Sequence, residues 1–287
     1  MSSQILVLHF GAHKTATSVI QRYLRDNPEL MEENKIAFLL RSESDGLIGW
    51  GGNVLDAGIA RLRAKIDDAF DSGAAYFILS HENTLGRPFK RDVNGLYPNR
   101  EGPLKKLAEA FSIYPKRVIY YIRSQEEFLE SYYLQKIHEG GTQTFKQWSR
   151  QINVESLSWR PVIESLQRAF GSNEVVVKDF AVEMANGQQE YLKRAFATFH
   201  QNLEPSRFSD FEYSPLHNIS IGTKGLEIAL AINRFAQTPE ERTKVRHFIQ
   251  RNFSNLQYPR PTLLSEEEKG RIKEFYAEEN SALTHEG

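Results

Sequence analysis

Small, basic and hydroxyl-bearing residues gather at positions 11–18, directly after the first apolar run of the chain. Residues 5–8 of that run are typical of a short strand buried on both faces. Ile20, Tyr23 and Leu24 follow at spacings of three and four, which predicts one face of a helix. The N–H groups of a first helical turn and the helix dipole attract anions, so this strand, loop and helix start predict a phosphate or sulfate site.

The side chains of the loop suit the same chemistry. Lys14 supplies a full positive charge next to His13, and three hydroxyl groups supply directional hydrogen bonds. A plainer alternative is a strand–helix turn in which Thr15 or Thr17 only caps the helix. Capping alone does not require Gly11, the basic pair and three hydroxyls together, so the residues favour anion binding. The hydroxyls belong to Thr15, Thr17 and Ser18.

The loop departs from the Walker A pattern, G-x-x-x-x-G-K-[ST]. A closing pair at Lys14 and Thr15 would place glycines at positions 8 and 13, where the chain has Leu8 and His13. The lysine–threonine pair is therefore kept without the glycine cradle. This difference argues against a nucleoside triphosphate wrapped in the usual way.

The segment G-A-H-K-T-A-T-S at positions 11–18 resembles the 5′-phosphosulfate-binding loop of sulfotransferases that use 3′-phosphoadenosine 5′-phosphosulfate (PAPS). In many bacterial members of that family the loop reads roughly H-x-G-x-H-K-T-G-T-T. The chain departs from it by Ala16, where a glycine is usual, and by Ser18, where a threonine is usual. Ser18 keeps a hydroxyl, whereas Ala16 restricts the backbone. The resemblance implies that PAPS is bound by Gly11, His13, Lys14, Thr15, Ala16, Thr17 and Ser18.

The second part of the resemblance follows another apolar run, residues 118–122, which predicts a strand with Arg123 at its carboxyl end. Ser124 and Glu127 form a capping-box pattern, so a helix that carries Ser131 should begin there. In the sulfotransferases, an arginine at a strand end and a serine eight residues later bind the 3′-phosphate. The resemblance implies this role for Arg123 and Ser131, although either residue alone also suits a solvated surface.

His81 and Glu82 directly follow a third predicted strand, at the sheet edge where ligands bind in parallel α/β folds. Sulfuryl transfer to a hydroxyl needs a base for the acceptor's proton, and an imidazole or a carboxylate can serve. The resemblance allows both, since some sulfotransferases use a histidine after such a strand and others use a glutamate. Adjacent residues tend to point in opposite directions, so we expect one of the two to face the site, with a preference for His81. A loop-fixing hydrogen bond is the alternative role for each.

Five predicted strands alternate with amphipathic helices, and each separation is long enough for a right-handed crossover. The pattern predicts an α/β fold: a five-stranded parallel sheet flanked by helices, like the three-layer sandwich of P-loop nucleotide kinases, with a helical C-terminal third. We expect one sulfotransferase-like domain over residues 1–287, with its core at about 4–180 and a helical portion at about 181–287. Residues 42–53 are expected to form a glycine-rich loop around Trp50. The predicted strands are residues 5–8, 35–40, 75–79, 118–122 and 174–178.

A long irregular segment at residues 83–101 carries four cations among aromatic rings. Long loops inside compact domains often have a function, and this one has the side chains to hold an anionic or sugar acceptor. A solvated loop balanced by Asp92 and Glu101 is the alternative. The cations are Arg87, Lys90, Arg91 and Arg100, and the rings belong to Phe89 and Tyr97.

The composition narrows the functional classes. The formal net charge is −1 and the pI is about 6.7, which gives no reason to invoke nucleic acid or an anionic membrane as partner. The absence of cysteine excludes disulfides and thiolate metal sites, and no clustered metal-ligand motif occurs. The N-terminus lacks signal-peptide features, and no apolar run approaches the ~20 residues of a membrane span. We expect a soluble cytoplasmic protein that needs no metal.

Together with the resemblance, these residues predict a sulfotransferase that moves a sulfuryl group from PAPS to a hydroxyl or amine of an unidentified acceptor, such as a carbohydrate. Lys14 would stabilise the negative charge that grows on the bridging oxygen. One alternative is a P-loop-type kinase that uses ATP and Mg²⁺, with Asp179 as its metal-holding carboxylate. Another is a non-catalytic module that binds a nucleotide or a sulfated glycan.

Overall fold

The chain forms two compact units. The first comprises Met1–Arg123, Glu155–Phe211 and Ala277–Gly287, and the second comprises Ser124–Val154 and Glu212–Tyr276. The sheet belongs to the first unit, and the described elements of the second unit are helices. The expectation of a single domain stays a prediction. The structure, a computed structural model, describes residues 4–48, 56–91, 93–199 and 219–285.

The five strands of the sheet are parallel and lie in the order β2-β3-β1-β4-β5. The central strand β1 has a neighbour on each side, and Leu6, Val7 and Leu8 are fully buried in it. Burial of one such aliphatic side chain stabilises the fold by about 1.5–3 kcal/mol, which explains the uninterrupted apolar run. The predicted sheet is confirmed. Its strands are β1 (Ile5–His9), β2 (Ile36–Leu40), β3 (Tyr76–Ser80), β4 (Lys116–Ile122) and β5 (Val175–Asp179).

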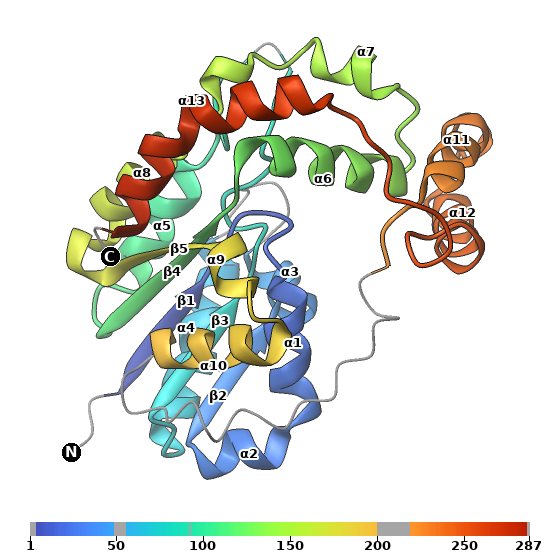
Figure 1. Cartoon of the computed structure of the whole chain (residues 1–287). Coiled ribbons are helices and arrows are strands. Elements are labelled where there is room, and N and C mark those ends of the chain that lie inside the picture. Colours follow the sequence, from blue (N-terminus) through green and yellow to red (C-terminus); the bar gives the residue numbers. More distant parts are fainter. Residues whose placement is uncertain (1–3, 49–55, 92, 200–218, 286–287) are drawn as a thin grey trace. The chain divides into compact units, whose positions relative to one another are not determined.

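Helices cover both faces of the sheet (Figure 1). From β1 the chain crosses to β2 in one direction, and from β2 onward it returns through β3 to β4 and β5 in the other. Because crossovers between parallel strands are right-handed, the two directions place their helices on opposite faces. Helix α1 (Thr17–Asp26) packs with α10 (Gln188–Phe199) on one face, and α4 (Asp56–Asp71), α5 (Glu101–Ala110) and α8 (Arg160–Phe170) lie on the other. The short elements of this unit are α2 (Pro28–Glu33), α9 (Phe180–Met184) and a 3-10 turn at Ser172–Glu174.

One segment that the sequence predicts as a loop is partly helical. Residues 42–48 belong to α3 (Arg41–Ile48), so the expected loop over 42–53 is wrong for this part, and Trp50 lies outside the described residues. The helix is stabilised by packing against α4, at a point where Gly58 allows close approach: a Cβ there would lie 1.8 Å from the carbonyl oxygen of Leu47. This contact connects separate parts of the sequence, so local propensity gave no sign of it.

Long-range hydrogen bonds within the second unit connect α6 to the segment before α13. The Glu130 carboxylate accepts from the backbone N–H groups of Leu263 and Leu264, each at 3.1 Å. Helix α6 begins directly after Ser124 as predicted, but Ser124 makes no side-chain capping bond, so the capping-box expectation at this position is wrong. The helices of this unit are α6 (Gln125–His138), α7 (Phe145–Ser149), α11 (Thr223–Ile232), α12 (Pro239–Asn252) and the first part of α13 (Glu266–His285), with a 3-10 turn at Asn233–Phe235. Another 3-10 turn, Val154–Ser156, begins at the last residue of this unit's first segment and continues into the first unit.

Candidate functional site at the carboxyl edge of the sheet

The loop that follows β1 lies at a point where the strand connections diverge. The connection after β1 leads toward β2, and the connection after the neighbouring β4 leads toward β5 on the opposite side. In open parallel sheets such a divergence leaves a crevice at the carboxyl ends of the strands, where ligands bind. The loop of residues 11–16, here called the anion loop, and Arg123 flank this position.

The backbone of the anion loop is fixed to β4 and then turns sharply. Phe10 N–H donates to the Ile119 carbonyl at 3.1 Å, and Ala12 N–H donates to the Tyr121 carbonyl at 3.0 Å. Three loop residues then have positive φ angles, 34° at Gly11, 69° at Lys14 and 54° at Ala16. A left-handed conformation costs a residue with a Cβ about 1–2 kcal/mol. Ala16 therefore occupies a conformation that favours glycine, the residue usual at this position in the loop that it resembles.

The hydroxyl of Thr15 closes the loop and does not cap the helix. It donates to the Ala12 carbonyl at 2.7 Å, while the N-cap of α1 is Ala16. The Tyr191 hydroxyl of α10 donates to the Thr15 carbonyl at 3.1 Å and so supports the loop from behind. The helix-capping alternative for Thr15 is thereby replaced by a loop-closing role.

The predicted residues of the loop separate into two sets by exposure. The side chains of Lys14 and Ser18 are exposed at the start of α1, whereas those of His13, Thr15 and Thr17 are buried. The exposed set combines an ammonium group and a hydroxyl group beside the N-terminus of a ten-residue helix. This arrangement can hold an anion through charge, a hydroxyl and the helix dipole.

Arg123 meets the anion loop directly, although 109 positions separate it from Lys14. Its Nη1 donates to the Lys14 carbonyl oxygen at 2.9 Å. Its guanidinium carbon lies 5.3 Å from the centroid of the Phe180 ring, and its own carbonyl accepts from Trp159 Nε1 at 2.7 Å. Two cationic residues from separate motifs are thus held at one edge of the sheet.

Ser131 belongs to the second unit, whereas Arg123 closes the first segment of the first unit. Within its own unit Ser131 lies on α6 and is buried. Its predicted partnership with Arg123 stays a prediction.

The His13 side chain is buried and hydrogen-bonded on both ring nitrogens. Nδ1 lies 2.8 Å from the Tyr97 hydroxyl, which also accepts from the His13 backbone N–H at 2.9 Å. With the Asn83 amide oriented so that its nitrogen faces His13, that nitrogen donates to Nε2 at 2.9 Å. Burial lowers the pKa of His13 from 6.5 to about 4, so the ring is neutral at physiological pH. Of the predicted basic pair, Lys14 therefore supplies the charge.

A second buried imidazole lies at the end of β1. His9 Nδ1 is 2.8 Å from the Ser80 hydroxyl, and its Nε2 has no hydrogen-bond partner within the described part of the chain. Burial lowers the pKa of His9 to about 4. This neutral ring fills the space beneath the anion loop.

His81 is completely buried, with both ring nitrogens engaged. Nε2 lies 3.0 Å from Asp45 Oδ1, and Nδ1 lies 3.1 Å from the Thr84 hydroxyl. The Thr84 hydroxyl also donates to the His81 carbonyl at 2.8 Å, which ties the side chain of Thr84 to this turn. His81 was the preferred candidate for the base. Its hydrogen bonds are those expected for the alternative role, a residue that fixes the loop.

Glu82 is the more accessible of the two candidate bases, with 14% of its side chain exposed. Arg41 Nη1 donates to its Oε1 at 2.7 Å, and Gln21 Nε2 donates to its Oε2 at 3.1 Å. Burial alone would raise the pKa of this carboxyl, but the Arg41 charge, a backbone hydrogen bond and the bond from Arg41 hold it below its ordinary value. Glu82 is therefore an ionised carboxylate at neutral pH.

Arg41, Asp45 and Tyr97 belong to this site and were missed as site residues by the sequence analysis. Arg41 follows β2 directly, so its position at a strand end was a usable signal. Asp45 lies one helical turn later, 3.5 Å from Arg41 Nε, but the segment was taken as a loop. Tyr97 was noted as part of the long segment 83–101, with no sign that it binds His13.

The long segment contributes structure as well as exposed charge. Tyr97 is fully buried, and Arg100 Nε donates to the Ser165 hydroxyl at 2.7 Å. Arg87, Lys90 and Arg91 are exposed. An acceptor-binding role for these three cations stays a prediction.

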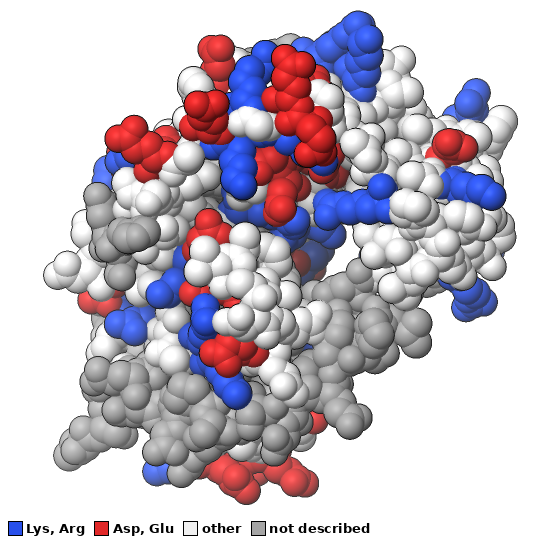
Figure 2. Space-filling view, in the orientation of Figure 1, with Lys and Arg blue, Asp and Glu red and all other residues white. Residues whose placement is uncertain are grey.

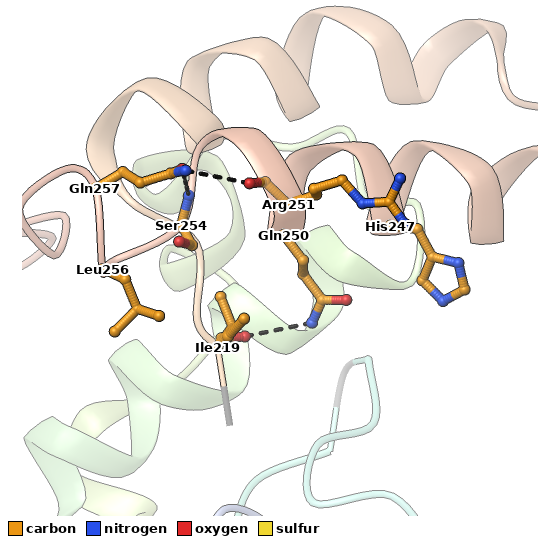
Figure 3. A pocket seen from close by; sticks show the side chains of 7 residues that line it. All are labelled: Ile219, His247, Gln250, Arg251, Ser254, Leu256 and Gln257. Carbon is orange, nitrogen blue, oxygen red and sulfur yellow. Dashed lines mark hydrogen bonds between the residues drawn. The ribbon is translucent and has the colours of Figure 1, made fainter. Parts of the chain in front are cut away.

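A separate cavity of about 450 Å³ lies within the second unit (Figure 3). His247 and Arg251 stand one turn apart on α12, and Gln250 Nε2 donates to the Ile219 carbonyl at 3.3 Å. Over the area that α11 and α12 occupy in Figure 1, Figure 2 shows Lys and Arg side chains among wide uncharged surface. None of the predicted site residues lines the cavity, so its volume does not identify it with the chemistry at the sheet edge. Its lining residues are Ile219, His247, Gln250, Arg251, Ser254, Leu256 and Gln257.

The described residues contain no group of three or more histidine, cysteine or acidic side chains placed to hold a metal ion. None of their helices is both long and apolar enough to cross a bilayer.

Comparison of the chain with models of known protein families found no match, and comparison with curated proteins found none either. Among solved structures the chain is similar to a crystal structure described as a sulfotransferase from Alicyclobacillus acidocaldarius. The TM-score is 0.42 and the sequence identity is 14%, over 86% of this chain and 96% of that one. A likeness at this level carries no conclusion about activity, so the assignments below depend on the residues of this chain.

Proposed function

We propose that the protein is a sulfotransferase that moves a sulfuryl group from PAPS to a hydroxyl or amine of an acceptor such as a carbohydrate. The observation that carries the proposal is the hydrogen bond from Arg123 Nη1 to the Lys14 carbonyl, 2.9 Å long. It brings together the two motifs that resemble the 5′- and 3′-phosphate sites of PAPS-dependent enzymes. An adenosine ligand with a phosphate at each end fits such a pair of cationic positions.

Different residues of the first unit suit the two ends of PAPS, the 5′-phosphosulfate and the 3′-phosphate. The exposed Lys14 and Ser18 side chains and the first turn of α1 suit the 5′-phosphosulfate. Arg123 suits the 3′-phosphate because a guanidinium presents several donors in a planar fork. Gly11, Thr15, Ala16 and Thr17 shape the loop around the ligand, and Ser131 is the predicted second residue for the 3′-phosphate.

The reaction needs one proton transfer and one displacement at sulfur. The acceptor oxygen or nitrogen forms a bond to sulfur while the bond from sulfur to the bridging phosphate oxygen breaks, which releases adenosine 3′,5′-bisphosphate. Glu82, ionised and partly exposed, takes the acceptor's proton, and Lys14 neutralises the charge left on the bridging oxygen. His81 cannot share the proton transfer in this arrangement, because it is buried and engaged by Asp45 and Thr84.

A kinase mechanism finds less support among these residues. It would require a carboxylate to hold Mg²⁺, for which Asp179 was the candidate. Asp179 Oδ1 instead accepts from the backbone N–H groups of Ala181 and Val182, at 2.7 and 3.2 Å, and so caps α9.

Calorimetric binding of adenosine 3′,5′-bisphosphate, adenosine 5′-phosphate and ATP with Mg²⁺ tests the proposal. We expect the bisphosphate to bind most tightly. Arg123→Gln should weaken bisphosphate binding about 10- to 100-fold, the loss of a charge-assisted hydrogen bond or two, and should remove the preference over the 5′-phosphate. Arg25→Gln serves as control, since Arg25 is exposed and its side chain forms an ion pair with its neighbour Asp26. Equal binding of both adenosine phosphates by the native protein, or tightest binding of ATP with Mg²⁺, would overturn the proposal.

A further inference from the structure

We propose that Arg41 is a positioning residue that holds the Glu82 carboxylate in one orientation and connects it, through Asn83 and His13, to the anion loop. The catalytic meaning of this proposal rests on the proposed sulfuryl transfer. The effect of Arg41 on the titration of Glu82 can be tested without any assumption about the reaction.

The Arg41 guanidinium contacts three groups at once. Nη1 donates to Glu82 Oε1 at 2.7 Å, and Nε lies 3.5 Å from Asp45 Oδ2. The Asn83 amide oxygen accepts from Nε and Nη2 at 3.0 and 3.1 Å when its nitrogen faces His13. A planar fork of donors can serve three acceptors in one plane, which a lysine ammonium cannot do with the same geometry.

A continuous series of hydrogen bonds leads from this guanidinium to the anion loop. The Asn83 nitrogen donates to His13 Nε2 at 2.9 Å, and Tyr97 holds the other side of the ring and the His13 backbone N–H. His13 directly precedes Lys14, whose carbonyl accepts from Arg123. The base and the two proposed phosphate-binding cations are therefore connected through one chain of contacts inside the first unit.

The other end of the network is anchored in the core. Asp45 forms an ion pair with Arg41 Nε through one oxygen, at 3.5 Å, and contacts buried His81 with the other, at 3.0 Å. His81 is held in turn by Thr84. This anchor limits the movement of Arg41, so the carboxylate that it holds is oriented before any acceptor arrives.

A purely architectural ion pair between Arg41 and Glu82 is the competing explanation. Both explanations predict loss of stability when Arg41 is replaced, so stability alone does not decide between them. They differ in the titration of Glu82 and in the pH dependence of turnover, because only a positioned base moves both together.

The decisive measurement is a ¹³C NMR titration of glutamate side-chain carboxyls in the full chain, with Glu82→Gln to assign the signal. In Arg41→Gln the midpoint of Glu82 should move upward by about 1–3 pH units, since the neighbouring cation is lost while burial remains. In Arg41→Lys it should stay close to that of the native protein. Arg25→Gln, which removes an exposed arginine, should leave it unchanged. If the titration midpoint of Glu82 were the same in Arg41→Gln as in the native protein, the proposed effect of Arg41 on Glu82 would be wrong.

The second measurement is hydrolysis of PAPS, in which water stands in for the acceptor and sulfate release is followed as a function of pH. The acidic limb of this profile should shift upward in Arg41→Gln together with the Glu82 midpoint. Arg41→Lys keeps the positive charge, so this variant should still fold. Its rate at neutral pH should be lower by about tenfold or more, because lysine lacks the planar set of donors that orients Glu82. A native rate and profile in Arg41→Lys and Arg41→Gln would overturn the positioning role.

Failure of the proposed function gives a different pattern. In that case the native protein would neither bind adenosine 3′,5′-bisphosphate nor hydrolyse PAPS, whatever the titration shows. Failure of the positioning role would leave binding and hydrolysis intact in the native protein and unaltered in both Arg41 variants.

Discussion

The carboxyl ends of β1 and β3 lie next to each other in the sheet and use charge in opposite ways. After β1, the anion loop turns Lys14 outward and keeps the neutral His13 beneath it. After β3, His81 is turned inward and Glu82 is paired with Arg41. The first end exposes a cation, and the second holds a mostly buried anion in one orientation. In the proposed function, the first end would bind the sulfuryl donor and the second would activate the acceptor, and neither would have to rearrange its own polar groups.

The largest effect should come from the outward charge at the end of β1. Lys14→Ala should lower PAPS hydrolysis or transfer about 100- to 1,000-fold, the cost of removing one group that stabilises developing negative charge. The urea midpoint should stay unchanged because the side chain is exposed. Lys105→Ala, which removes an exposed lysine of α5, is the matched control. Comparable losses in both variants would remove the special role of the anion loop.

Replacement of Glu82 at the end of β3 should lower the reaction rate without changing the affinity for the sulfuryl donor. Glu82→Gln should lower turnover about 100-fold, as expected for loss of a general base, while calorimetric affinity for adenosine 3′,5′-bisphosphate stays native. His81→Gln should instead lower the urea midpoint, since it breaks the contacts to Asp45 and Thr84. The reverse pattern, with turnover lost only in His81→Gln, would restore the histidine as base.

The neutral histidines beneath the anion loop should make stability depend on pH. The pKa values of His9 and His13 are lowered to about 4, so the unfolded chain takes up two more protons than the folded chain between pH 6.5 and 4. Stability should therefore be full above pH 6.5 and fall with decreasing pH, by at most about 1.4 kcal/mol per pH unit for each histidine. Urea unfolding at pH 7.5, 6.0 and 5.0 measures this slope. A flat response would mean that the fold does not lower the pKa values of these two rings.

The smallest effect should come from the backbone of the anion loop. Ala16→Gly relieves the left-handed strain of about 1–2 kcal/mol but adds unfolded-state entropy, so the net gain should be about 0.5 kcal/mol. The urea midpoint should rise slightly. Ala12→Gly, at a loop alanine without a positive φ, should lower it. If the urea midpoint of Ala16→Gly fell by as much as that of Ala12→Gly, the backbone at Ala16 would not be strained.

The sequence was sufficient for the sheet and for the convergence of Lys14 with Arg123. Apolar runs in the five strands are local patterns, and parallel topology brings their carboxyl ends to one edge. Arg123 directly follows such a run and Lys14 lies in the loop after another, so their proximity comes from the same rule.

The burial of individual polar residues could not be predicted in this way. Whether His13 faces a ligand or the interior depends on Tyr97 and Asn83, which lie far away in the chain. His81 likewise depends on Asp45, and Asp45 on a helix that the local sequence did not indicate. Polar contacts between distant segments leave no periodic signal, and the position of Arg41 directly after a strand does not by itself indicate its partners.

Gly58 shows how far the control of this edge extends. It contacts neither the anion loop nor Glu82 through any side chain, yet α3 can approach α4 only because position 58 lacks a Cβ. A methyl group at this position would clash with the Leu47 carbonyl and displace α3. Helix α3 carries Arg41 and Asp45. Gly58→Ala would thus disturb the contact between Arg41 and Glu82 from a helix that contributes no residue to the candidate site.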